Sequence, residues 1–224
     1  MGTGNYNEKT SALYTDLSVM TASPVIGADG AAFFRNMLTD NLEGEYDALL
    51  VAPKGLKPSL CDLIQAEIDK GSDGYICIKA NSVTERDIID KLQEASQAGV
   101  QVEMIIRGIC CIRPGVLLKT EHIQVTSIVG RYLEHARIYC FGKDAEELMF
   151  ISSADFMTRN MDHRVEVGCP IDSPQVRQKI HRIIELQRMD NTKARRMRSD
   201  GTYRRVTTGK LPIGAQDALM RMPI

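Results

Sequence analysis

Several features are scarce in this sequence of 224 residues, and each scarcity narrows what the protein can be. Net charge is almost absent, because 28 Lys and Arg face 29 Asp and Glu and leave a formal charge of −1. No overall field therefore attracts a polyanion, so nucleic acid is not indicated as a partner, and an anion site must come from locally placed cations. No apolar run approaches the ~18 residues of a membrane-spanning helix, so no transmembrane segment is expected, while peripheral membrane association stays open.

Paired cysteines are also missing. The six cysteines form no CxxC pair, and most lie in apolar, strand-like runs where a reduced thiol packs as a small hydrophobic group. This pattern favours a reducing compartment, and we expect a cytoplasmic protein.

What is present suits a globular chain: 43% of residues are apolar and 25% are charged, which is enough for one good core or for one domain plus part of another. The organisation predicts three regions. Residues 1–45 begin with a glycine-rich, polar turn and resemble a piece of something larger, with a strand expected over 13–21 and a helix over 30–42. Residues 46–190 form the main domain, and residues 191–224 form a basic C-terminal tail.

The main domain alternates between strand and helix patterns, which predicts an α/β fold with a mixed sheet flanked by helices. A buried strand in ALLVAP precedes a helix over 60–70 capped by Ser59, and the strand YICIKAN precedes a helix over 84–98 ended by Gly99. Five further strands are expected, in VQVEMIIRG, HIQVTSIV, ARIYCF, ELMFISS and RVEVGCPI, and a helix over 174–186 follows them.

The last region contains six basic residues between Lys193 and Arg205 and loses clear periodicity. Such a run is typical of a solvated tail or a subunit contact, and an anion site is the alternative.

Candidate site residues lie at or near the ends of predicted strands. Arg107 ends the strand before Gly108, and Lys79 and Asn81 end the neighbouring strand, which is where α/β sheets place groups that contact ligands. His135 precedes Arg137 by two residues in a strand-like run, so alternation places both side chains on one face. Ordinary alternatives stay open: a salt bridge for Arg107, and a histidine satisfied by its neighbour Glu134.

The segment after ELMFI gathers further polar groups. Ser152, Ser153 and Asp155 close that strand, and Arg159 follows them. Hydrogen-bond donors and cations collected at strand ends suit phosphate chemistry.

Long motifs in this sequence resemble the C-terminal half of the bacterial polyphosphate kinases that are built on phospholipase-D-like domains. The resemblance covers residues 1 to about 220 and is carried by SIVGRYLEHARIYCF, MIIRGICCIRPG, EASQAGV, ISSADFMTRNMDHRVEV and GTGNYNEKTSALYTDLSVMTA. It implies a phospholipase-D-like mixed sheet flanked by helices, preceded by a remnant of a first such domain.

By position, the resemblance assigns three nucleotide-binding residues. Tyr14 in LYTD matches the tyrosine that contacts the base, Arg107 in IIRG matches an arginine that contacts the nucleotide, and His135 in LEHAR matches the second active-site histidine. The implied reaction is reversible transfer of the ATP terminal phosphoryl group to polyphosphate through a phosphohistidine. ATP or ADP and polyphosphate are then the substrates, Mg²⁺ is expected in the full enzyme, and the full-length enzyme is expected to be a homo-oligomer. In this reaction His135 would serve as the general acid for the leaving group, and Arg107 and Arg137 would neutralise charge.

The sequence departs from the family pattern in two ways. The phospholipase-D signature has lysine two residues after the histidine and aspartate five further on, and Arg137 and Gly142 stand there instead. The family's nucleophilic histidine and its magnesium-contacting arginines are expected before Met1, so the chain resembles a truncation or one piece of a split enzyme, and we expect no turnover by this chain alone. Two alternatives remain: a phosphodiesterase or lipid-phosphate transferase of the wider superfamily, completed by dimerisation, and a non-catalytic module that binds nucleotide or polyphosphate.

Overall fold

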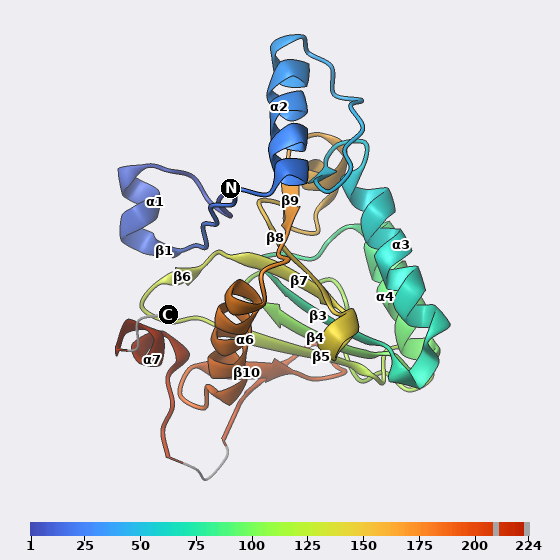
Figure 1. Ribbon diagram of the computed structural model, residues 1–224. Coiled ribbons are helices and arrows are strands. Elements are labelled where there is room, and N and C mark those ends of the chain that lie inside the picture. Colours follow the sequence, from blue (N-terminus) through green and yellow to red (C-terminus); the bar gives the residue numbers. More distant parts are fainter. Residues whose placement is uncertain (208–210, 222–224) are drawn as a thin grey trace.

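The computed structural model describes residues 1–207 and 211–221, and a nine-stranded mixed sheet lies at its centre (Figure 1). The strand order is β11-β10-β5-β4-β3-β7-β8-β9-β2. The three strands β3, β4 and β5 run parallel to one another, and all other neighbours are antiparallel. The strands are β2 (Leu50–Val51), β3 (Tyr75–Ala80), β4 (Gln101–Ile106), β5 (Ile123–Ile128), β7 (Arg137–Phe141), β8 (Leu148–Ser152), β9 (Val167–Pro170), β10 (Ala194–Met197) and β11 (Tyr203–Arg205).

A separate pair of short strands joins the N-terminal segment to the middle of the chain. β1 (Tyr14–Thr15) pairs in parallel with β6 (Leu133–Glu134). The helices are α1 (Glu8–Leu13), α2 (Pro24–Leu38), α3 (Leu56–Asp69), α4 (Arg86–Gln97), α5 (Thr158–Asp162), α6 (Pro174–Met189) and α7 (Ala215–Arg221). The predicted α/β architecture, a mixed sheet flanked by helices, is confirmed.

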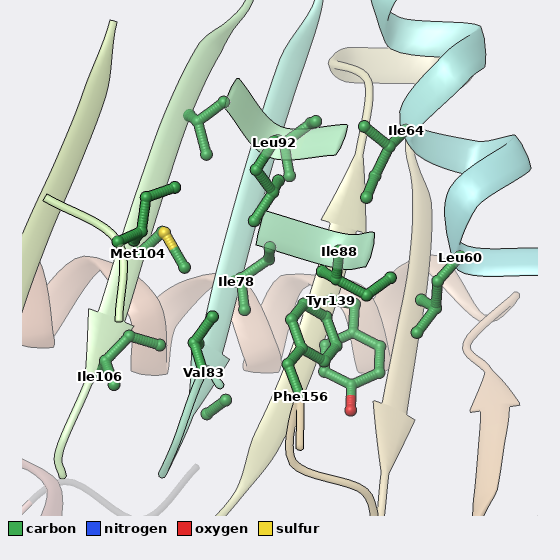
Figure 2. Packing of buried hydrophobic residues seen from close by; sticks show 14 of the residues in the cluster. Leu60, Ile64, Ile78, Val83, Ile88, Leu92, Met104, Ile106, Tyr139 and Phe156 are labelled. Atoms are coloured by element: carbon green, nitrogen blue, oxygen red, sulfur yellow. The ribbon is translucent and has the colours of Figure 1, made fainter. Parts of the chain in front are cut away.

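Helices cover both faces of the sheet, with α3 and α4 on one face and α6 on the other (Figure 1). Successive strand residues point to opposite faces, so β3 sends Ile78 toward α3 and α4 and sends Cys77 toward α6. Figure 2 shows the first of these two cores, in which Ile88 and Phe156 lie beside the buried ring of Tyr139. The second core joins strand residues to Ile180 and Ile184 of α6.

Three expectations for helices and strands before residue 70 were wrong in detail. A strand was expected over 13–21, but residues 8–13 form α1, capped by the Asn7 side chain, and only Tyr14–Thr15 forms a strand, because β6 offers two residues to pair with. The helix expected over 30–42 is α2, which begins at Pro24, a residue favoured in the first turn. The helix expected from residue 60 is α3, which begins at Leu56, so Ser59 lies inside the helix and Gly55 occupies the cap.

The expected basic tail is also corrected by the structure within the described residues. Residues 194–205 contribute β10 and β11, which extend the sheet beyond β5, and α7 packs against α6. The reason is visible in β10, where Ala194 and Met197 are buried while the two arginines between them point to solvent. The carboxylate of Asp190 fixes the turn into β10 by accepting hydrogen bonds from the backbone N–H groups of residues 192–194, and it also accepts from the N–H of Ala215.

Candidate functional site

A polar pocket of about 350 Å³ lies where β3 and β4 end and β7 begins. Its lining residues come from distant parts of the chain, from Thr3 to Glu166. Eight of the residues predicted from the sequence line it: Tyr14, Asn81, Arg107, His135, Arg137, Ser153, Asp155 and Arg159. The carboxyl ends of parallel strands are thus the location of the pocket, as expected for an α/β sheet.

Arg107 and Asn81 form the floor of the pocket at the ends of neighbouring strands. The Arg107 Nε donates to the Asn81 Oδ1 at 3.1 Å and to the carbonyl oxygen of Glu134 at 2.8 Å. These contacts fix the guanidinium through neutral oxygens, without an ion pair to any described carboxylate. Its positive charge therefore remains available to a ligand.

His135 is held by groups from the N-terminal segment. Its Nδ1 lies 2.8 Å from the Asp16 Oδ1, and its ring meets the Tyr14 ring edge-on with centroids 4.8 Å apart. The Arg137 Nη1 lies 3.3 Å from the same Nδ1, so the predicted placement of the imidazole and guanidinium on one face is confirmed. The alternative partner Glu134 points to the other face of β6, where it meets Lys79.

The protonation of the neutral His135 ring follows from these neighbours. A carboxylate can only accept a hydrogen bond and a guanidinium can only donate one. Because Asp16 is the nearer group, Nδ1 carries the proton and donates to it, which leaves Nε2 as the nitrogen open to a ligand. Partial burial raises the pKa of Asp16, but hydrogen bonds from His135 and Thr3 and the charges of His135 and Arg137 outweigh that effect and hold the pKa below its usual value.

Arg137 is a fixed, buried cation. Its Nη2 forms an ion pair with the Asp155 Oδ2 at 2.9 Å, and its Nη1 donates to the carbonyl oxygen of Thr3 at 2.6 Å. Asp155 also accepts from the backbone N–H of Asn81 at 2.6 Å. Burial raises the pKa of Asp155, and the Arg137 and Asn81 contacts more than offset this, so the pKa lies below the ordinary value.

The rim carries more exposed polar groups. Arg159 and Arg164 line the pocket with exposed side chains from α5 and the segment after it. The Ser153 hydroxyl donates to Glu166, which also accepts from the Asn160 amide. Two exposed guanidinium groups at the mouth give the pocket a local positive character that the net charge of −1 conceals.

Two predicted residues do not line the pocket. Lys79 is 2% exposed and lies on the α6 face, where its Nζ is 3.1 Å from the Glu134 Oε2. Ser152 is fully buried, and its hydroxyl donates to the carbonyl oxygen of Val167. Ser152 is next to Ser153, which lines the pocket, so alternation turns the Ser152 side chain the other way. Lys79 lies inside β3, whereas Asn81 lies just beyond the end of that strand.

The sequence did not point to Asp16 and Thr3, which hold His135 and Arg137. The sequence LYTD could have pointed to Asp16, because residues 14 and 16 lie on the same face of an extended segment. In the structure both side chains contact His135. Thr3 contributes a carbonyl oxygen and a hydroxyl from an irregular segment, and no sequence pattern predicts such a contact.

Fold and pocket together define a class: α/β proteins with a polar, arginine-rich pocket at the carboxyl ends of parallel strands. Comparison with known families narrows it. The family model for polyphosphate kinase C-terminal domain 2 matches residues 49–216, and the one for polyphosphate kinase C-terminal domain 1 matches residues 1–43. The chain belongs to the polyphosphate kinase family.

Individual relatives agree with this assignment. The polyphosphate kinase of Staphylococcus epidermidis is 43% identical over 227 residues, covering 100% of this chain and 31% of the relative. That of Synechocystis is 43% identical over 206 residues, covering 91% of this chain and 28% of the relative. The crystal structure of polyphosphate kinase from Porphyromonas gingivalis superposes with a TM-score of 0.91 at 38% identity, covering 99% of this chain and 35% of that one. The chain thus spans about a third of the length of these relatives.

A more distant structure, the phospholipase D family member Nuc from Salmonella typhimurium, matches 67% of this chain and 97% of its own, with a TM-score of 0.49 and 16% identity. Within residues 1–207 and 211–221, no helix is long and apolar enough to cross a membrane.

Proposed function

We propose that this chain forms the nucleotide- and phosphate-contacting part of an enzyme that reversibly transfers the terminal phosphoryl group of ATP to polyphosphate through a phosphohistidine. The observation that carries the proposal is the state of His135. The Asp16 Oδ1 lies 2.8 Å from Nδ1, so Nε2 is the ring nitrogen left for a ligand, in a pocket that is also lined by Arg107 and Arg137, two arginines held in place by the protein. Once the ring is protonated at Nε2, it is a proton donor in a pocket with fixed cations, which is what departure of ADP requires.

Each pocket residue has a chemical task in this proposal. When the bond between the γ-phosphorus and its bridging oxygen breaks, negative charge develops on the ADP oxygen, and the phosphorus forms a bond to the nucleophilic histidine. Because Asp16 holds the first ring proton at Nδ1, a second proton adds at Nε2; the resulting imidazolium of His135 donates that proton to the ADP oxygen and returns to the neutral ring. Arg107 and Arg137 balance charge on the phosphates. Tyr14 contacts the base.

The remaining pocket groups contact phosphate oxygens. Asn81, Ser153 and Arg159 present donors at the pocket, and Asp155 orients Arg137 for this purpose. Lys79 and Ser152 lie behind the pocket and support it through their neighbours.

Mg²⁺, which the resemblance implies for the full enzyme, does not fit the residues of this pocket. The two carboxylates that line it are engaged, Asp155 with Arg137 and Asn81, and Glu166 with Ser153 and Asn160. The described residues contain no cluster of three His, Cys, Asp or Glu suited to a metal. No step is assigned to Mg²⁺ at these residues.

For the 224-residue chain itself, binding without turnover is the second candidate. Of the four histidines, His135 is the one that lines the described pocket, and a phosphohistidine mechanism with a separate proton donor needs another. We further propose that residues 1–45 belong to a first phospholipase-D-like domain and residues 46–190 to a second, in a cytoplasmic, homo-oligomeric enzyme.

Calorimetry with ATP and with polyphosphate, alongside an assay for phosphoenzyme from radiolabelled ATP, tests these proposals. We expect the purified chain to bind ATP without forming phosphoenzyme, and Arg107→Ala to weaken binding by roughly tenfold or more through loss of a charge-assisted contact. Arg86→Ala removes the same charge from an exposed helix position and serves as the control. Absence of ATP binding would overturn the assignment of the pocket, and phosphoenzyme in this chain would overturn the expectation of binding alone.

A further inference from the structure

A buried polar cluster lies directly behind the pocket, on the α6 face of the sheet. At its centre is the Glu134 carboxylate, which receives the Lys79 Nζ at 3.1 Å, the Gln187 Nε2 at 2.7 Å and the Gln216 Nε2 at 2.8 Å. Each of these four residues is less than a tenth exposed. Burial raises the pKa of Glu134, but Lys79 and the hydrogen bonds outweigh it and keep the carboxyl ionised.

Glu134 immediately precedes His135, so this cluster and the pocket share one backbone segment. Along a strand the two side chains take opposite directions, Glu134 toward α6 and His135 toward Asp16. The carbonyl oxygen of Glu134 accepts from the Arg107 Nε at 2.8 Å. A rotation of β6 that released the Glu134 carboxylate would therefore displace both His135 and the main support of Arg107.

Helix α7 reaches the same segment through one side chain. The Gln216 Oε1 accepts from the Tyr132 N–H at 3.1 Å, and its Nε2 donates to the Tyr132 carbonyl oxygen at 2.9 Å as well as to Glu134. The carboxamide lies so close to Gly130 that an added Cβ there would be 2.5 Å from the Gln216 Oε1. Gln216 thus forms hydrogen bonds both to the backbone of Tyr132, which precedes β6, and to the side chain of Glu134 within β6.

The cluster has a geometric role that its contribution to stability does not explain. A buried ion pair costs desolvation energy that its attraction barely repays, and an apolar pair of similar volume is often as stable. The Lys79 Nζ also donates to the carbonyl oxygen of Ala136 at 3.2 Å. Lys79 therefore contacts both the residue before His135 and the residue after it. These bonds define the position of the segment 132–136.

We propose that Glu134 and Gln216 are positioning residues for His135 and Arg107. Helix α7 therefore contributes to the geometry of the pocket, although Gln216 is more than 80 residues from Glu134 in the sequence. The proposal rests on the proposed nucleotide-binding function of that pocket. It gives Lys79 a role through Glu134 in place of direct contact with phosphate.

The test is Gln216→Ala in the full 224-residue chain, measured by calorimetry with ATP and by the proton–carbon NMR signal of the His135 ring. We expect roughly tenfold weaker ATP binding and a displaced His135 signal, since bonds to a charged group and to the β6 approach are lost together. The rings of His122, His163 and His181 serve as internal references whose signals stay in place. Gln124→Ala, the same change at an exposed strand position, should alter neither readout.

Unchanged ATP binding together with an unchanged His135 signal in folded Gln216→Ala would overturn the positioning role. If the unaltered chain binds no ATP, the proposed function fails, and the His135 signal alone still decides whether Gln216 positions the ring. Should Gln216→Ala fail to fold, Gln216→Met keeps the volume that packs α7 and removes the same hydrogen bonds, and the same two readouts decide.

Discussion

At the residue scale, the side chain of Asp16 determines which nitrogen of His135 carries the proton. Its carboxylate lies 2.8 Å from Nδ1, nearer than Arg137, and Thr3 holds it there by donating to the Asp16 Oδ1 at 2.8 Å. The neutral ring therefore keeps Nε2 unprotonated toward a ligand, and protonation adds its hydrogen at the position where a leaving group would receive it.

Replacing Asp16 by Asn tests this assignment. Asn can turn its N–H₂ toward Nδ1, so we expect the neutral ring to move its proton to Nε2 and ATP binding to change with it. Proton–nitrogen NMR correlations of the His135 ring report the tautomer directly. Asp62→Asn, at an exposed position of α3, is the matched control. A ring already protonated at Nε2 in the unaltered chain would contradict the assignment.

Asp155 provides a prediction about pH. Its pKa is lower in the folded protein than in the unfolded chain, where it is about 3.9, so the folded state gains stability above that pH and loses it as the pH falls through the folded value. Asp155→Asn leaves Arg137 buried without a countercharge, and we expect a loss of about 3 kcal/mol in the free energy of unfolding at neutral pH.

Urea unfolding from about pH 3 to pH 7 measures this effect. The difference between the unaltered chain and Asp155→Asn should shrink below about pH 4, because protonation removes the same charge from the unaltered chain. Asp172→Asn, at an exposed position, should show no comparable difference. A difference that stays constant over the whole range would count against the ion pair as its source.

At the element scale, α2 is joined to the rest of the chain mainly by a polar contact. Asp29 is its one buried residue, and the carboxylate accepts hydrogen bonds from the backbone N–H groups of Asp47, Ala48 and Leu49 at 3.1, 2.7 and 2.9 Å. In Figure 1, α2 projects away from the sheet, and all of its side chains except Asp29 are half-buried or exposed. Asp29 therefore fixes α2 relative to the entry into β2.

Asp29→Ala should loosen this junction. Three backbone donors lose their acceptor, and we expect the free energy of unfolding to fall by about 1–3 kcal/mol. Hydrogen exchange should accelerate at the amides of residues 47–49 while the amides of β3 and β4 stay protected. Arg35→Ala, on the exposed surface of the same helix, serves as the control. Equal exchange rates in both variants would show that other contacts hold the helix.

The accuracy of the predicted elements depended on how local their signals are. The strands β3 and β4 and the helix α4 were predicted well, because each has a clear period and Gly99 ends the helix with φ of +95°. β10 was not predicted, because its two adjacent arginines interrupt the apolar pattern of a strand that is only four residues long. Its formation depends on pairing with β5, more than 60 residues away. Strand formation of this kind is decided by a distant partner, which local patterns do not reveal.

At the scale of the whole molecule, the pocket was predictable only where a general rule places a side chain. Strand ends placed Arg107 and Asn81 together, and alternation placed His135 beside Arg137. The contact between Asp16 and His135 joins residues 119 positions apart and depends on the pairing of β1 with β6. Strands of two residues are too short to give a recognisable sequence pattern, so this pairing could not be predicted. The sequence resemblance indicated the family, whereas the structure was needed to identify Asp16 and Thr3, which hold His135 and Arg137 in place.

The position of β11 at the end of the sheet has a consequence for how copies of this protein behave in concentrated solution. An outer strand presents unpaired N–H and C=O groups, on which another chain can add a strand and begin edge-to-edge aggregation. β11 is short, and its exposed residues include Arg204 and Arg205, while β2 at the opposite end has two residues. Like charges repel across such an approach, so the basic run that ends the sheet also protects it from growing.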